Sequence, residues 1–116
     1  RTLRPLDDSL ILESVRKTGR LIVADDGWKT GGFAAEVVAR VAEKALGDIK
    51  SPPQRVALPD CPTPTSRALT KHYYPRAVHI RTIARQMLGF VPAEEKPQVN
   101  ESIPLDVPDK CFTGPF

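Results

Sequence analysis

The fold is decided by residues 20–33, which read Arg-Leu-Ile-Val-Ala-Asp-Asp-Gly-Trp-Lys-Thr-Gly-Gly-Phe. The first six residues form a short apolar run without alternation, a pattern typical of a strand buried on both faces of a parallel sheet. Glycines then mark a turn, and apolar residues recur at helical spacing from Phe33 until Gly47. The stretch therefore predicts a strand over 20–25, a loop, and a helix of about fourteen residues.

A second strand is expected a short distance along the chain. Residues 51–53, Ser-Pro-Pro, break the chain, and residues 54–58 form another short run with strand character before Pro59 and Asp60. A strand, a helix and a strand within about forty residues make a βαβ unit, whose crossover is right-handed in nearly all proteins. The fold class is therefore α/β.

A helix is predicted ahead of this unit, over residues 9–18. Asp7 or Asp8 can accept the unpaired N–H groups of its first turn, and Gly19 provides a left-handed stop. Its apolar residues are Leu10, Ile11 and Val15.

Two further helices are expected after the second strand. Ser66 can cap a short helix that Pro75 ends. The last helix closes at Gly89 and turns four polar residues to solvent. These are Arg76, Arg81, Arg85 and Gln86, and the apolar face opposite them holds Ile80, Ile83, Ala84, Met87 and Leu88.

We therefore predict a domain over residues 1–88 and an extended tail over residues 89–116. The tail holds five of the twelve prolines, with five acidic and two basic residues and no periodic apolar pattern. Its acidic and apolar residues suit a strap laid over a basic partner surface. The apolar ones are Ile103, Leu105, Val107, Phe112 and Phe116.

The predicted sheet is too small. Two parallel strands leave both edges bare, whereas such sheets usually have about four to six strands. Arg1, Thr2 and Leu3 could end a further strand, so we expect the chain to begin inside a longer fold.

Composition excludes several classes of protein. The 116 residues are 41% hydrophobic and 27% charged, with a net charge of +3 from intermixed acidic and basic residues, so neither disorder nor nucleic-acid binding is indicated. The longest apolar run, residues 21–24, is far shorter than a membrane span. With only Cys61 and Cys111 and no charged-then-apolar leader, we expect no disulfide framework and a cytoplasmic protein.

The candidate site is the loop between the first strand and the long helix. Ligands of α/β folds bind at the carboxyl ends of strands, and helix N-termini attract anions. The loop lacks the spacing of a dinucleotide or triphosphate motif, so a purely structural turn is the main alternative to an anion site or an interface. The candidate residues are Asp26, Gly27, Trp28, Thr30, Gly31 and Gly32.

No catalytic, cofactor-binding or metal-binding residue is predicted. Asp25, Asp26 and Asp60 follow strand ends, but capping explains them as well as metal ligation or acid–base chemistry does. His72 and His79 are expected on different helices, and no cysteine or carboxylate lies at ligand spacing from them.

Four motifs carry a family resemblance. These are Arg-Thr-Leu-Arg-Pro-Leu-Asp at 1–7, Thr-Gly-Arg-Leu-Ile-Val at 18–23, Gly-Trp-Lys-Thr-Gly-Gly-Phe at 27–33, and Pro59-Asp60 followed by Pro62 and Pro64. In this order they resemble the transketolase C-terminal domain. They look most like the end of the β subunit of the thiamine-diphosphate-dependent dehydrogenase component of 2-oxoacid dehydrogenase complexes, those acting on pyruvate, branched-chain 2-oxoacids or acetoin. Two positions depart from the family pattern, Asp26 in place of glutamate and Ala34 where glycine is common.

The resemblance implies a three-layer sandwich with a mainly parallel mixed sheet, whose first strand and helix would lie upstream of residue 1. It implies that thiamine diphosphate and magnesium are bound by other parts of the parent enzyme. This chain would then be an inactive assembly domain that contacts the α subunit and a second β subunit of a heterotetramer and the dihydrolipoyl acyltransferase. The alternatives are the C-terminal domain of a transketolase or deoxyxylulose-phosphate synthase, and a free-standing anion-binding α/β module.

Overall fold

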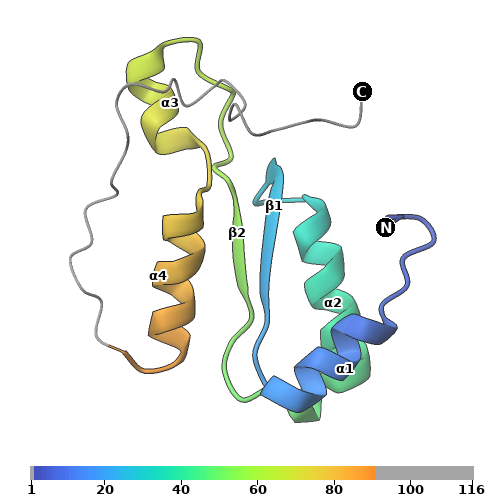
Figure 1. The fold of residues 1–116 in the computed structure, drawn as a ribbon. Coiled ribbons are helices and arrows are strands. Elements are labelled where there is room, and N and C mark those ends of the chain that lie inside the picture. The colour runs from blue at the N-terminus through green and yellow to red at the C-terminus, as the bar shows by residue number, and fades with distance from the viewer. Residues whose placement is uncertain (1, 91–116) are drawn as a thin grey trace, which may run out of the picture.

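A parallel pair of strands separates the helices into two layers (Figure 1). The computed structural model describes residues 2–90. Helices α1 and α2 lie on one side of the sheet and α4 lies on the other, so the expected three-layer α/β arrangement is confirmed. The elements are α1 (Ser9–Thr18), β1 (Ile22–Trp28), α2 (Phe33–Ala45), the 3₁₀ turn η1 (Leu46–Asp48), β2 (Gln54–Leu58), α3 (Arg67–Tyr73) and α4 (Ala77–Met87).

Helix α1 has the bounds that its sequence predicts. Gly19 ends it in the left-handed conformation, at φ 69°, and the Gly19 N–H donates to the Val15 carbonyl at 2.7 Å. Asp7 is the carboxylate that binds the first turn, because its Oδ1 accepts from the Ser9 N–H at 3.0 Å. Asp8 stands at the N-cap position without a capping side-chain bond, and its carboxylate has other partners.

The first strand differs from its prediction in length and burial. β1 continues to Trp28 instead of ending at Asp25, because an irregularity after Ala24 inserts extra residues before Trp28 pairs with Leu58. None of its residues is buried, so burial on both faces was a wrong expectation. Over residues 2–90 the sheet has only two strands, too few to cover β1.

The hydrophobic core lies between α1 and α2. Its centre is formed by Leu12, Val15, Val41 and Ala45, and Val41 is fully inaccessible to solvent. Ile11, Leu21 and Ile49 pack against this cluster. The predicted helical spacing of α2 therefore identifies the packed side of the molecule.

Helix α4 is packed much more loosely. None of its residues is buried, and Ile80 and Leu88, both assigned to its apolar face, are exposed. The Arg20 Nε donates to the Met87 carbonyl at 3.1 Å and ties the end of α4 to the chain before β1. The short helix before it begins after Ser66, but the Ser66 side chain makes no capping bond.

Two expectations concern the chain ends. Thr2 and Leu3 are not part of a strand, which corrects the expected strand end there. The predicted tail over 89–116 lies outside the described residues except for Gly89 and Phe90. Within residues 2–90, no helix has the length and apolar character needed to span a membrane.

Candidate functional site

The loop that follows β1 is organised by the carboxylate of Asp25. Its Oδ1 accepts the Gly27 N–H at 2.9 Å, and its Oδ2 accepts the Ala34 N–H, in the first turn of α2, at 3.0 Å. A negative group is favoured at a helix N-terminus because unpaired N–H groups point outward there. The chain's own carboxylate thus binds at the place where an external anion was expected.

Gly31 and Gly32 of this loop are each required for a different physical reason. A Cβ on Gly32 would lie 2.0 Å from the Trp28 carbonyl oxygen, so only glycine allows this close approach of two backbone segments. Gly31 has φ +72°, a left-handed conformation that glycine adopts without strain. The paired glycines are therefore required by the geometry of the turn.

The other side of the loop is bound to the end of β2. Asp60 accepts the Thr30 N–H at 2.8 Å and the Thr30 hydroxyl at 2.6 Å, and these bonds lower the pKa of the Asp60 carboxyl. The Lys29 N–H donates to the Leu58 carbonyl at 2.9 Å, and the Arg55 Nη1 donates to the Lys29 carbonyl at 2.5 Å. The loop is therefore fixed at several points.

Trp28 is held by this fixed backbone but its side chain is not packed away. It is 56% exposed. Beside it lies an open pocket of about 440 Å³, lined by Trp28, Thr30, Asp60, Cys61 and Pro62. A large aromatic ring on a preorganised backbone has little conformational entropy to lose on binding, which is the usual property of an interface anchor.

Asp25, Asp26 and Asp60, for which metal ligation or acid–base chemistry was the alternative to capping, do not gather into such a site within the described residues. Asp25 and Asp60 each bind backbone N–H groups, and Asp26 is exposed. Residues 2–90 hold no group of three histidines, cysteines or carboxylates placed to bind a metal ion.

The two histidines lie on separate helices, as expected. His72 is in α3 and His79 is in α4, and both are exposed. The His79 Nδ1 accepts the Arg76 N–H at 2.9 Å, which closes the first turn of α4. This contact gives His79 a structural role at a helix terminus.

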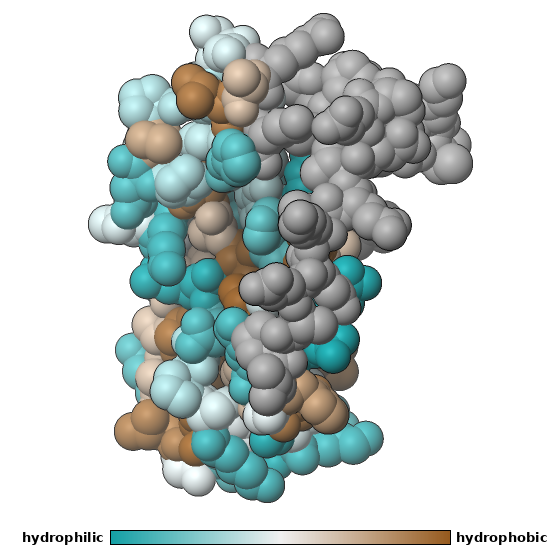
Figure 2. Space-filling model, turned by 90° about the vertical axis from the view of Figure 1, so that its left-hand side faces the viewer, coloured by the Kyte–Doolittle hydropathy of each residue, from teal (hydrophilic) through white to brown (hydrophobic). Residues whose placement is uncertain are grey.

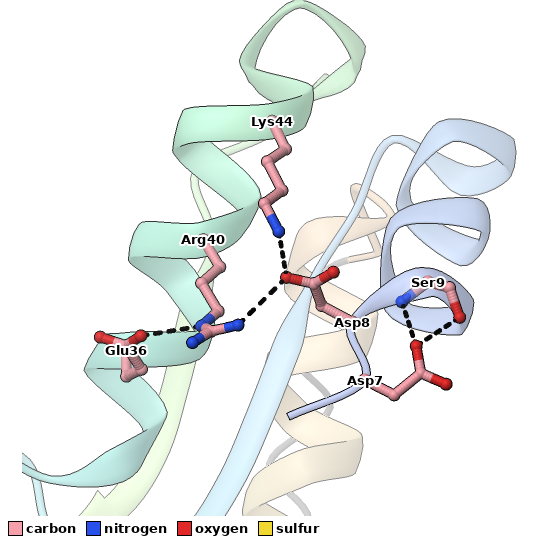
Figure 3. Close-up of polar contacts among 6 residues, drawn as sticks. All are labelled: Asp7, Asp8, Ser9, Glu36, Arg40 and Lys44. Carbon is pink, nitrogen blue, oxygen red and sulfur yellow. Dashed lines mark hydrogen bonds and ion pairs between the residues drawn. The ribbon is translucent and has the colours of Figure 1, made fainter. Parts of the chain in front are cut away.

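A network of charges that was not predicted from the sequence joins α1 to α2 (Figure 3). Asp8 lies 2.6 Å from the Lys44 Nζ and 3.4 Å from the Arg40 Nη1, and Arg40 also binds Glu36 at 2.8 Å. Lys44, and then Arg40, lower the pKa of the Asp8 carboxyl. The spacing of Glu36, Arg40 and Lys44 at intervals of four is the signal that could have indicated one charged face of α2.

The comparisons with known proteins agree with this architecture. Residues 1–80 match the family described as "Transketolase, C-terminal domain". The acetoin:2,6-dichlorophenolindophenol oxidoreductase subunit beta of Cupriavidus necator is 40% identical over 88 residues, which cover 76% of this chain and 26% of that protein. The pyruvate dehydrogenase E1 component subunit beta of Bacillus subtilis is 40% identical over 90 residues, which cover 78% and 27%.

A mitochondrial relative gives the same picture. The pyruvate dehydrogenase E1 component subunit beta of Drosophila melanogaster is 36% identical over 90 residues, covering 77% of this chain and 25% of that protein. The matched part thus spans about a quarter of the length of these relatives. The family match is consistent with the three-layer arrangement and with the loop of Gly31 and Gly32 after β1. The chain belongs to the transketolase C-terminal domain family.

Proposed function

We propose that this chain is a non-catalytic assembly domain of a 2-oxoacid dehydrogenase β subunit. The observation that carries the proposal is the fixed loop with an exposed Trp28, in a chain similar to the β subunits of pyruvate and acetoin enzymes. Residues 1–88 would form the domain, and residues 89–116 a separate tail. The parent enzyme would decarboxylate a 2-oxoacid oxidatively, with thiamine diphosphate and magnesium bound outside this domain, and pass the acyl group to a lipoyl carrier.

The proposed partners are an α subunit and a second β subunit, in a heterotetramer, and the dihydrolipoyl acyltransferase of the complex. The candidate contact surface, which we call the Trp28 loop, is made of Asp26, Gly27 and Trp28 at the end of β1 and of Thr30, Gly31 and Gly32 after it. Its backbone is held to β2 and α2 by hydrogen bonds, so the surface is formed before a partner arrives. An exposed aromatic ring beside an open pocket suits a protein contact.

The anion-binding alternative is less well supported by the same geometry. The Ala34 N–H donates to Asp25, and the N–H and hydroxyl of Thr30 donate to Asp60. An added anion would have to displace one of these two carboxylates and would be repelled by the other. The interface interpretation needs no such displacement.

The proposal that the domain is part of a β subunit is tested by measuring the intact mass of the native polypeptide that carries this sequence. A chain some 200 residues longer would support a β subunit. A native chain no longer than these residues would overturn the parent-enzyme part of the proposal.

The contact surface is tested by Trp28→Ala in the full-length β subunit with its α subunit. If Trp28 anchors a subunit contact, the dissociation constant of the assembly should rise about thirtyfold, as for an interface hot spot. Light scattering over a dilution series measures this. Leu46→Ala is the matched control, because Leu46 is 68% exposed and lies beyond the other end of α2. Equal dissociation constants for the two variants would contradict the assignment.

A further inference from the structure

Charge changes sign abruptly near the end of the described residues. Residues 61–90 contain five basic and no acidic residues, whereas residues 91–116 contain five acidic and two basic ones. The two segments follow each other directly. Their net charges, +5 and −3, are therefore complementary.

The basic residues of α4 form a stripe. Arg81 and Arg85 are four residues apart, and Leu88 follows three residues later, so all three share one side of the helix. Exposed Phe90 follows the end of α4. We call Arg81, Arg85, Leu88 and Phe90 the arginine stripe. Figure 2 looks at the molecule from the α4 side and shows hydrophobic patches among hydrophilic ones.

The stripe combines charge with apolar area. Leu88 is 55% exposed and Phe90 is 58% exposed, at the end of the helix where the described chain finishes. A surface of this kind suits an acidic segment that also carries apolar side chains, because ion pairs alone are weak when exposed. The segment 91–116 has this composition, with Ile103, Leu105, Val107, Phe112 and Phe116 among its carboxylates.

The end of α4 brings the chain back to the stripe. Gly89 has φ +78°, its N–H donates to the Gln86 carbonyl at 3.0 Å, and the Phe90 N–H donates to the Arg85 carbonyl at 3.0 Å. These two bonds make a Schellman motif, which stops the helix and turns the chain out of its axis. Phe90, the last described residue, consequently lies beside Arg85.

The segment is long enough to reach the whole stripe. From Arg85 to Arg81 the helix spans four residues, about 6 Å at the helical rise. Glu94 and Glu95 lie four and five residues beyond Phe90, within about 16 Å if that stretch is extended. The first acidic pair can therefore reach both arginines of the stripe, and 26 residues leave ample chain beyond it.

We propose that residues 91–116 of this chain dock on its own arginine stripe. The linkage is favourable, because a segment joined directly to its site has an effective concentration in the millimolar range. A contact with a dissociation constant of about 0.1 mM would then be at least nine-tenths occupied. The basic surface that binds the predicted tail would then be α4 of the same chain. This proposal does not depend on the assembly role of the Trp28 loop.

The test is hydrogen exchange of the α4 amides in the native polypeptide at 0.1 M salt. Arg81→Glu should speed their exchange about fivefold, and Glu94→Lys with Glu95→Lys should do the same, since each change removes two or three weak ion pairs. The combined charge swap should restore slow exchange. The same loss of protection is expected for the unchanged chain at 1 M salt, where charges are screened within about 3 Å.

The controls separate docking from a local effect on the helix. Lys17→Glu places the same charge change on α1 and should leave α4 exchange unchanged. A variant that ends at Phe90 should exchange as fast as Arg81→Glu. The proposal is overturned if the variant ending at Phe90 keeps the protection, if the charge swap fails to restore it, or if protection falls on dilution, because dilution identifies a second copy as the occupant. None of these outcomes depends on subunit assembly at Trp28.

Discussion

The two faces of the β1–β2 sheet carry amphipathic helices that are packed very differently. On one face, α1 and α2 enclose a core in which Val15 and Val41 are almost inaccessible to solvent. On the other face, no residue of α4 is buried, although its apolar residues recur at the same spacing. Periodicity therefore identifies which side of a helix is apolar, but the width of the surface beneath it decides how much is buried.

The polar contacts of the two faces differ in the same way. Helix α2 is joined to its surroundings by the Asp25 carboxylate at its start and by Asp8 along its side. Helix α4 is closed by His79 at its start and attached near its end by Arg20. The α2 side should therefore be more sensitive to substitution than the α4 side.

The largest effect is expected from Gly32→Ala. The new Cβ would lie 2.0 Å from the Trp28 carbonyl oxygen, so the loop has to move, at a cost of about 3 kcal/mol in the free energy of unfolding. Gly89→Ala on the α4 side meets no atom within 4 Å and should cost only about 1 kcal/mol, from its left-handed conformation. Urea unfolding of both variants measures the difference, and equal costs would break the comparison.

Val41→Ala should come next. It removes two methyl groups from a fully buried site between α1 and α2, which costs about 2 kcal/mol through lost burial and the cavity left behind. Ile83→Ala truncates a half-buried residue of α4 and should cost about 1 kcal/mol although it removes more atoms. Chemical denaturation compares the two. A larger loss for Ile83→Ala would place a second core under α4.

Asp25→Ala should have a smaller effect. It leaves the Gly27 and Ala34 N–H groups without their acceptor, and the loss of such a cap costs about 1 to 2 kcal/mol. His79→Ala removes the corresponding contact of α4 at an exposed site and should cost about 0.5 kcal/mol. Thermal unfolding provides both values. Equal shifts in melting temperature would mean that the two contacts contribute equally to stability and would contradict the prediction.

The smallest effect is expected at the Asp8 charge network, and it depends on pH. Lys44 and Arg40 lower the pKa of the folded Asp8 carboxyl, so its contribution to stability is present above the ordinary value of 3.8 and is lost as pH falls below it. Asp8→Asn should therefore lower the melting temperature slightly at pH 7 and leave it unchanged at acidic pH, so that the fall of the melting temperature in acid becomes flatter. If the melting temperature of this variant fell as steeply at acidic pH as that of the unchanged chain, the pH dependence would belong to other carboxylates.

Much of the local structure was predictable. The bounds of α1 and β2, the start of α2 and the glycine stop after α1 follow from periodicity and from residues that adopt special backbone conformations. The family resemblance is confirmed as well, because its motifs are short continuous stretches that survive in one sequence. The end of β1 was misjudged because strand propensity does not reveal where an irregular strand rejoins its neighbour.

The sequence by itself determined the order and type of the elements, the position of the glycine loop and the family, since each depends on residues close together in the chain. Only the tertiary structure decided that Asp25 binds the start of α2, that Asp60 holds Thr30, and that α4 stays half-uncovered. Thr30 and Asp60 are thirty residues apart, and hydrogen bonds act over about 3 Å. No local pattern specifies which distant groups folding brings within that range.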